Sequence, residues 1–165
     1  MKLNFVYLRP SQLVGFRKVG PYRETAGQAW SLMFDWLDRN GLRGQVKRGF
    51  GMAFDDPRKT VAEKCRYMAC IDMPDMLPTP AWEDMIPQGL PGGAYARHRL
   101  VGDHSHVSDV IRDIRDQWSN RAGVVLAKGR PLVEIYLDDP KFCEPEKLRT
   151  DVCLPVAFAE ELEMA

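Results

Sequence analysis

The chain contains an internal repeat, and this feature limits its possible folds more than any other. The second half follows the first in the same order, at an offset of 82 residues up to Gly123 and of 83 residues beyond it. The matched pairs are Gly20/Gly102, Tyr22/His104, Trp36/Trp118, Gly41/Gly123, the Asp-Asp-Pro segments 55–57/138–140, Lys64/Lys147, Arg66/Arg149 and Cys70/Cys153. An ordered series with a nearly constant offset predicts a structural unit that is present twice.

Each copy has the pattern strand-helix-strand-strand. Apolar residues three or four positions apart predict one amphipathic helix from Ala26 to Leu37 and another from Val107 to Trp118. The expected strands are 13–19, 49–54 and 64–72 in the first copy and 95–101, 132–137 and 148–156 in the second. The predicted fold class is α+β, with tandem pseudo-symmetric repeats forming one antiparallel-rich sheet with two main helices.

The segment between the copies interrupts this pattern. Residues 74–93 hold five of the twelve prolines and end in two glycines. We therefore expect a single domain over 1–165, with half-repeats at about 8–73 and 94–156 and a linker at 74–93. Trp82, Met85 and Ile86 are too apolar for a passive tether, so the linker is expected to pack back onto the domain, where it can form a flap over a site.

Composition narrows the function classes. Twenty-three basic and 23 acidic residues give a net charge of zero, which argues against direct nucleic-acid binding. The expected location is the cytoplasm, because no apolar run approaches a membrane span and the amino terminus does not resemble a signal peptide. The four cysteines form no C-x-x-C pair, which favours buried thiols. We expect no metal and no cofactor, because only His104 and His106 cluster and no nucleotide fingerprint is present.

The copies differ at one pair of positions that can carry function. The second expected strand of each copy (49–54 and 132–137) shares a large apolar face, but its other face carries Gly51 and Ala53 in the first copy and Glu134 and Tyr136 in the second. A carboxylate and a phenol opposite minimal side chains predict a ligand pocket between the copies, with Glu134 as its central polar group. The alternative is that Glu134 is simply solvated on an exposed strand face.

Other aromatic residues are candidates for the walls of this pocket. Tyr67 and Trp30 have no aromatic counterpart in the second copy, and Trp82 lies in the linker. Tyrosine and tryptophan suit flat or cationic ligands through stacking and cation–π contact. The alternative, that helix tryptophans belong to the core, is preferred for Trp36 and Trp118, which both copies share.

Taken together, the motifs resemble the GyrI-like superfamily over roughly residues 8–156. The segments that carry the resemblance are Gly20-Pro21-Tyr22, Trp36, Asp55-Asp56-Pro57, Cys65-Arg66-Tyr67, Ala69-Cys70, Gly92-Gly93-x-Tyr95-Ala96, Pro131-x-Val-Glu134-Ile-Tyr136 and Asp151-x-x-Leu154-Pro155-Val156. That superfamily, of the SHS2 fold type, includes effector-binding domains of AraC-type regulators, multidrug-binding regulators and the DNA gyrase inhibitory protein.

The resemblance implies roles for particular residues. Glu134 matches the family glutamate that binds cationic aromatic drugs, with Tyr136 beside it, and Tyr67 matches the aromatic residue of the Cys-Arg-Tyr stretch. Some members hydrolyse strained cyclopropanoid toxins with the same glutamate and a tyrosine, which makes Glu134 and Tyr67 or Tyr136 the candidate catalytic residues of an enzyme. Met68 and the segment 102–104 depart from the family pattern, and no helix-turn-helix segment precedes residue 8, so we expect a stand-alone member.

Three functions follow from this reading. The first is a protein that binds or sequesters a hydrophobic, cationic aromatic compound. The second is a hydrolase in which Glu134 is the general base. The third is a protein-interaction role, with gyrase or a regulator protein as partner, which rests on family membership alone.

Overall fold

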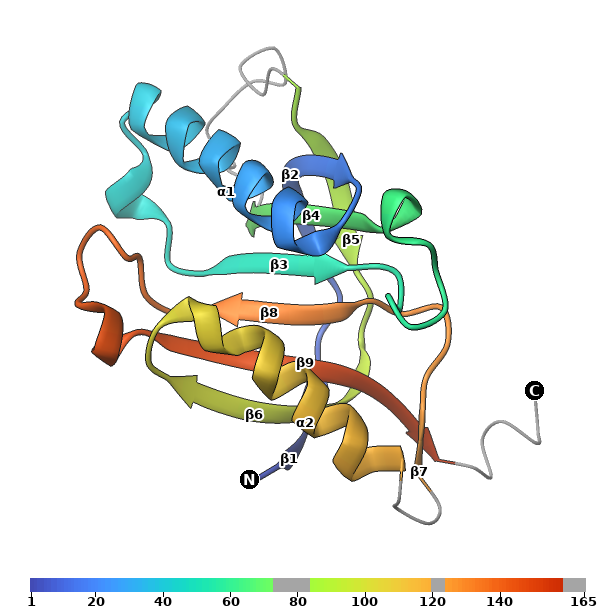
Figure 1. The fold of residues 1–165 in the computed structure, drawn as a ribbon. Coiled ribbons are helices and arrows are strands. Elements are labelled where there is room, and N and C mark those ends of the chain that lie inside the picture. The colour runs from blue at the N-terminus through green and yellow to red at the C-terminus, as the bar shows by residue number, and fades with distance from the viewer. Residues whose placement is uncertain (73–83, 120–123, 159–165) are drawn as a thin grey trace. The chain divides into compact units, whose positions relative to one another are not determined.

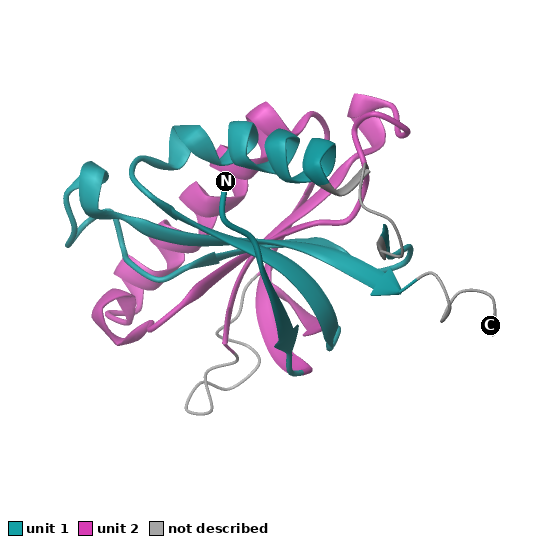
Figure 2. Cartoon of the chain, turned by 90° about the horizontal axis from the view of Figure 1, so that it is seen from below, with its two compact units in different colours: residues 1–9, 91–165 teal, residues 10–90 magenta. Residues whose placement is uncertain are grey.

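The computed structural model describes residues 1–72, 84–119 and 124–158, and it divides the chain into two compact units. The first half-repeat unit comprises residues 10–90, and the second half-repeat unit comprises residues 1–9 with 91–165 (Figure 2). Each unit contains one long helix and its own antiparallel strands (Figure 1). The α+β class and the tandem strand-helix-strand-strand pattern are therefore confirmed.

The first half-repeat unit has four antiparallel strands in the order β5-β2-β4-β3. Its elements are β2 (Ser11–Val19), α1 (Tyr22–Arg39), the 3-10 helix η1 (Arg43–Gln45), β3 (Gly49–Ala53), the 3-10 helix η2 (Ala62–Lys64), β4 (Arg66–Asp72) and β5 (Ile86–Leu90). Helix α1 contacts β2 and β4. It begins after Gly20, whose φ of +145° suits glycine, and ends at Asn40 and Gly41, where glycine again takes a positive φ of 65°.

The core of this unit lies between α1 and one face of the strands. Trp36 and Met33 of the helix are fully buried against Val14 of β2 and Ala69 of β4. The expected core role of Trp36 is confirmed. Met85, which precedes β5, is buried in the same cluster, so the linker does pack back at this position.

The second half-repeat unit repeats this arrangement. Its elements are β1 (Asn4–Leu8), β6 (Gly93–Val101), the 3-10 helix η4 (His104–His106), α2 (Val107–Ser119), β7 (Val124–Leu126), β8 (Leu132–Tyr136), the 3-10 helix η5 (Pro145–Lys147) and β9 (Arg149–Phe158). The strand order is β1-β6-β9-β8, and β7 pairs with the end of β9. Helix α2 contacts β6, β7 and β9, and its Ile114 is fully buried. The side chain of Trp118 lies outside the described part of the structure.

Three strands were not expected from the sequence. Within the segment interpreted as a linker, Ile86–Leu90 is a strand that pairs with β2. It contains Pro87 and a glycine, which weaken a strand pattern, but proline is tolerated because β5 lies at an edge of its unit. Strand β1 pairs with β6 and the three-residue β7 pairs with β9, and both are too short for a clear alternation. Residues 74–83, where a flap was expected, lie outside the described residues.

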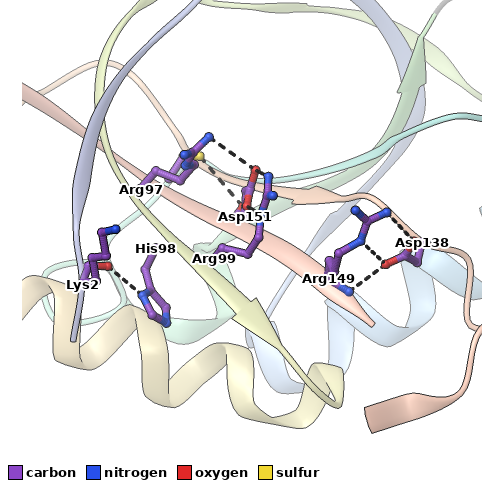
Figure 3. Close-up of polar contacts among 8 residues, drawn as sticks. Lys2, Arg97, His98, Arg99, Asp138, Arg149 and Asp151 are labelled. Atoms are coloured by element: carbon purple, nitrogen blue, oxygen red, sulfur yellow. Dashed lines mark hydrogen bonds and ion pairs between the residues drawn. The ribbon is translucent and has the colours of Figure 1, made fainter. Parts of the chain in front are cut away.

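The Asp-Asp-Pro segments close equivalent connections in both units. Asp55 accepts hydrogen bonds from the backbone N–H of Arg66 at 2.8 Å and from its guanidinium at 3.0 Å. Asp138 binds Arg149 in the same way, at 2.9 and 3.0 Å, as Figure 3 shows. The backbone N–H groups of Gly20 and Gly102 also donate to equivalent carbonyls, both at 2.8 Å. The repeat therefore extends to individual hydrogen bonds.

These ion pairs predict a pH-dependent contribution to stability. Arg66 holds the pKa of the Asp55 carboxyl below its ordinary value, so the pair stabilises the fold above about pH 4 and is lost as the pH falls through the folded-state pKa. We expect Asp55→Asn to lower the free energy of unfolding by roughly 1 kcal/mol at neutral pH, because Arg66 is half exposed and solvent screens the pair. Denaturant titrations at several pH values measure this. A loss that persists unchanged below the folded-state pKa would contradict the ion-pair explanation, and Asp35→Asn on the exposed face of α1 is the control.

Candidate functional site

Glu134 and Tyr136 lie side by side on one face of β8. Glu134 is only 8% exposed, so the expected withdrawal of this carboxylate from water is confirmed. The Tyr136 hydroxyl donates a hydrogen bond to Glu134 Oε2 at 2.5 Å. Because side chains alternate along a strand, Val133 and Ile135 point to the opposite face, where both are buried. Glu134 is therefore buried within a strand whose neighbouring apolar residues are buried as well.

His104 joins this pair and was not identified from the sequence. Its ring contacts the Tyr136 ring edge-on, with 4.7 Å between the ring centroids. The position is set by Asp103, whose side chain accepts a hydrogen bond from the Ser105 N–H at 2.9 Å and caps η4. Burial lowers the pKa of His104, which keeps the imidazole neutral at neutral pH. The available signal was the replacement of the first copy's Gly-Pro-Tyr by Gly-Asp-His.

Thr150 completes a polar cluster on the same face. It lies directly across from Tyr136 on β9, and cross-strand partners project from the same side of a sheet. Thr150 is fully buried. We call Glu134, Tyr136, His104 and Thr150 the acidic cluster, and all four belong to the second half-repeat unit.

The first half-repeat unit holds a different set at the equivalent positions. Tyr67 is 1% exposed, and its hydroxyl accepts a hydrogen bond from the Trp30 indole at 2.9 Å. The Trp30 ring packs against Phe34, with 5.6 Å between centroids, and the Tyr67 ring contacts Tyr22 edge-on at 6.1 Å. We call Trp30, Tyr67 and Tyr22 the aromatic cluster.

Small residues of β3 accompany the aromatic cluster. Gly51 and Ala53 are opposite Ala69 and Tyr67 of β4, on the face that packs against α1. Gly49 belongs to the same row, and a Cβ there would come within 2.7 Å of the Trp30 ring. Gly49 was not identified from the sequence. A glycine two positions before Gly51 was the only signal, and alternation along the strand would have placed both on one face.

The structure therefore groups the predicted site residues by unit. Glu134 lies with Tyr136 in the second half-repeat unit, and Trp30 lies with Tyr67, Gly51 and Ala53 in the first. Trp82 lies outside the described residues. The tyrosine of the equivalent cross-strand pair lies on different strands in the two units. In the first unit Tyr67 of β4 faces Ala53 of β3, and in the second Tyr136 of β8 faces Thr150 of β9.

A second buried carboxylate in the second half-repeat unit has a structural partner. Asp151 is 5% exposed and lies on the opposite face of β9 from Thr150. The Arg99 guanidinium binds it through two hydrogen bonds of 2.7 and 2.9 Å, and Arg97 approaches to 3.9 Å (Figure 3). Glu134, on β8, accepts a hydrogen bond from the Tyr136 hydroxyl instead.

The described residues offer no alternative centre for metal chemistry. In residues 1–72, 84–119 and 124–158, histidine, cysteine, aspartate and glutamate form no group of three or more that could hold a metal ion. Within the same residues, none of the helices has the length and apolar character needed to cross a bilayer.

The chain is similar to known proteins over most of its length. Residues 1–157 match the sequence model of the family described as the GyrI-like small molecule binding domain. The probable transcriptional regulator YgiV of Escherichia coli (strain K12) is 30% identical over 124 residues, which cover 74% of this chain and 76% of that protein. A DNA gyrase inhibitor of the same strain is 30% identical over 136 residues, covering 77% of this chain and 80% of the relative.

A solved structure shares the fold. The structure of SAV2435 bound to tetraphenylphosphonium superimposes with a TM-score of 0.66 and covers 98% of this chain and 97% of that one, at 17% sequence identity. The fold is therefore common to both proteins although few residues are. With the match to the family over residues 1–157, these similarities show that the chain belongs to the family of GyrI-like small-molecule-binding domains.

Proposed function

We propose that this domain binds hydrophobic cations that carry aromatic rings, with the Glu134 carboxylate as the counter-charge. The observation that carries the proposal is the burial of Glu134 beside the Tyr136 hydroxyl. An ionised carboxylate withdrawn from water is costly unless charges or hydrogen bonds compensate it. An organic cation would bring a positive charge to the carboxylate, and its apolar body is compatible with the buried surroundings.

Aromatic side chains provide the second part of the proposal. Within the acidic cluster, the Tyr136 hydroxyl binds the carboxylate, and the neutral His104 ring contacts the Tyr136 ring. In the first half-repeat unit, Trp30 and Tyr67 of the aromatic cluster, with the small residues Gly51 and Ala53, are also proposed as ligand-binding residues. Aromatic faces attract cations through their quadrupoles, most strongly where water is excluded.

The comparisons support this ligand class. SAV2435, which shares the fold, is bound to tetraphenylphosphonium, a cation surrounded by four phenyl rings. Its charge is fixed and its surface is almost wholly aromatic, which is the chemistry that a buried acid with aromatic neighbours would recognise. Tetraphenylphosphonium is therefore the probe of choice for this chain.

Calorimetric titration with two matched compounds tests the proposal. Triphenylphosphine oxide resembles tetraphenylphosphonium in its phenyl rings but is neutral. We expect the cation to bind at least about tenfold more tightly, because a charge-assisted contact contributes more than about 1.4 kcal/mol. Equal affinities, or no binding of the cation at millimolar concentration, would refute the proposed counter-charge.

Hydrolysis at the same glutamate remains the alternative for an enzyme. In the structure the tyrosine hydrogen-bonded to Glu134 is Tyr136, whereas Tyr67 accepts a hydrogen bond from Trp30 in the first half-repeat unit. A base-assisted attack by water would therefore rely on Glu134 and Tyr136 in the first instance. Incubation with an electrophilic cyclopropane compound, followed by mass spectrometry of the hydrated product, distinguishes turnover from binding.

A protein partner is supported by one further observation. A relative that is 30% identical is named DNA gyrase inhibitor, and the alignment covers 80% of its length. Inhibition of gyrase-catalysed supercoiling by this chain would establish the interaction. Unchanged supercoiling at a large molar excess of the chain would count against it.

A further inference from the structure

Two polar atoms of the acidic cluster have no hydrogen-bond partner. Among the described residues, the buried side-chain atoms without a partner are His104 Nε2 and Thr150 Oγ1. The large majority of buried polar side-chain atoms in proteins are hydrogen-bonded, so each exception needs an explanation. Here both exceptions fall in the second half-repeat unit, in residues next to Tyr136.

The two residues are neighbours of the same side chain. Thr150 is the cross-strand partner of Tyr136, and the His104 ring stands edge-on to the Tyr136 ring at 4.7 Å. The Tyr136 hydroxyl in turn donates to Glu134. The two unpartnered atoms therefore belong to neighbours of the tyrosine that binds the proposed counter-charge.

The first half-repeat unit shows that the fold itself does not require such unsatisfied atoms. The residue equivalent to His104 is Tyr22, whose hydroxyl lies 3.0 Å from the backbone oxygens of Asp55 and Arg66. The residue equivalent to Thr150 is Tyr67, whose hydroxyl accepts from the Trp30 indole at 2.9 Å. Both positions carry satisfied polar groups in one copy and unsatisfied ones in the other.

The chemistry of the two atoms points to a ligand that donates hydrogen bonds. A neutral imidazole has one acceptor nitrogen, and a threonine hydroxyl accepts through two lone pairs. Near a bound cation, the His104 tautomer with its proton on Nδ1 is favoured, because it presents a lone pair rather than an N–H at Nε2. A protonated amine or amidine supplies both the positive charge and the N–H donors, whereas a fully substituted cation supplies only the charge.

We propose that His104 Nε2 and Thr150 Oγ1 accept hydrogen bonds from N–H groups of the bound cation. This chain would then prefer protonated arylalkyl amines or amidines over fully substituted cations. The inference rests on the proposed function, since it assumes a cation at Glu134. It adds two specificity-determining residues that the similarity to tetraphenylphosphonium-bound SAV2435 does not supply.

A matched pair of probes tests this inference. (Naphthylmethyl)ammonium has three N–H groups, and trimethyl(naphthylmethyl)ammonium has none, but both carry one positive charge and the same ring. For the wild-type chain we expect the N–H cation to bind about tenfold more tightly, which corresponds to one or two hydrogen bonds to buried acceptors.

Two variants locate the preference. His104→Phe keeps the ring contact with Tyr136 and removes both nitrogens, and Thr150→Val replaces the hydroxyl by a methyl group of similar size. Each is expected to reduce the ratio of the two affinities at least about threefold, because only the N–H cation loses a hydrogen bond. Thr150→Val should also leave the melting temperature unchanged or raised, because it removes an unsatisfied buried group. A purely structural role for Thr150 would lower it.

The outcomes separate this inference from the proposed function. An unchanged ratio in both variants, or a wild-type chain that binds the fully substituted cation as tightly as the N–H cation, overturns the role of His104 and Thr150. If tetraphenylphosphonium still binds in that case, the proposed function stands without the inference. If neither naphthylmethyl cation nor tetraphenylphosphonium binds, both are overturned.

Discussion

Replacing Glu134 by glutamine is expected to weaken tetraphenylphosphonium binding by about 5- to 150-fold, which corresponds to about 1–3 kcal/mol for a lost charge-assisted contact. Glutamine keeps the shape of the side chain and can still accept a hydrogen bond from Tyr136, so only the charge is removed. The carboxylate is 8% exposed, and its attraction for a cation is therefore less screened than at a surface. Calorimetric titration of both proteins measures the difference.

Glu146→Gln is the matched control for this change. Glu146 lies on the exposed 3-10 helix η5 of the same unit, so the variant alters the net charge equally without touching the acidic cluster. We expect its affinity for tetraphenylphosphonium to stay within about twofold of wild type, because charges in bulk solvent are screened. An equal loss of affinity in both variants would mean that net charge alone causes the effect. Unchanged affinity in Glu134→Gln would show that Glu134 is not part of the binding site.

Gly15→Ala is expected to lower the free energy of unfolding by about 3 kcal/mol. Gly15 lies in β2 opposite Cys70 of β4, and a Cβ there would stand 2.1 Å from the Ala69 carbonyl oxygen and 2.7 Å from Cys70 Sγ. A backbone oxygen within a strand cannot withdraw as the end of a flexible side chain can, so β2 and β4 must separate. Urea denaturation followed by tryptophan fluorescence gives the change.

Gly27→Ala, at another glycine of the same unit, is expected to raise the free energy of unfolding. Gly27 lies inside α1, is exposed, and an added Cβ would meet nothing within 4 Å. Because alanine is the better helix former, we expect a gain of about 0.5–1 kcal/mol. Similar changes in stability for the two variants would mean that the close approach at Gly15 does not exist in solution.

The repeat allowed much of the fold to be predicted from the sequence. The six expected strands and two helices were all found, with ends that differ by a few residues. Such elements are predictable because their apolar periodicity is long and local. Strand β5 was missed because Pro87 and Gly89 argue against a strand locally, and only its pairing with β2 reveals it.

The candidate site was predictable only in part. Glu134 was found because the two copies differ there, and the structure withdraws it from water as expected. His104 and Thr150 were not selected as site residues. They replace Tyr22 and Tyr67 of the other copy, but a replacement does not by itself show that the hydrogen bonds of those tyrosines are lost. Whether a buried polar atom is hydrogen-bonded depends on its partners, and those partners lie on other helices and strands.

The sequence by itself determined the duplicated unit, the alternation that sets Glu134 and Tyr136 on one face of β8, and the Asp-Asp-Pro connections. These follow from periodicity and local hydrogen bonding, which involve residues close together in the chain. Only the tertiary structure decided that Arg99 binds Asp151, that the Tyr136 hydroxyl donates to Glu134 and that His104 lies against Tyr136. Burial and electrostatics depend on residues distant in sequence, and folding alone brings those together.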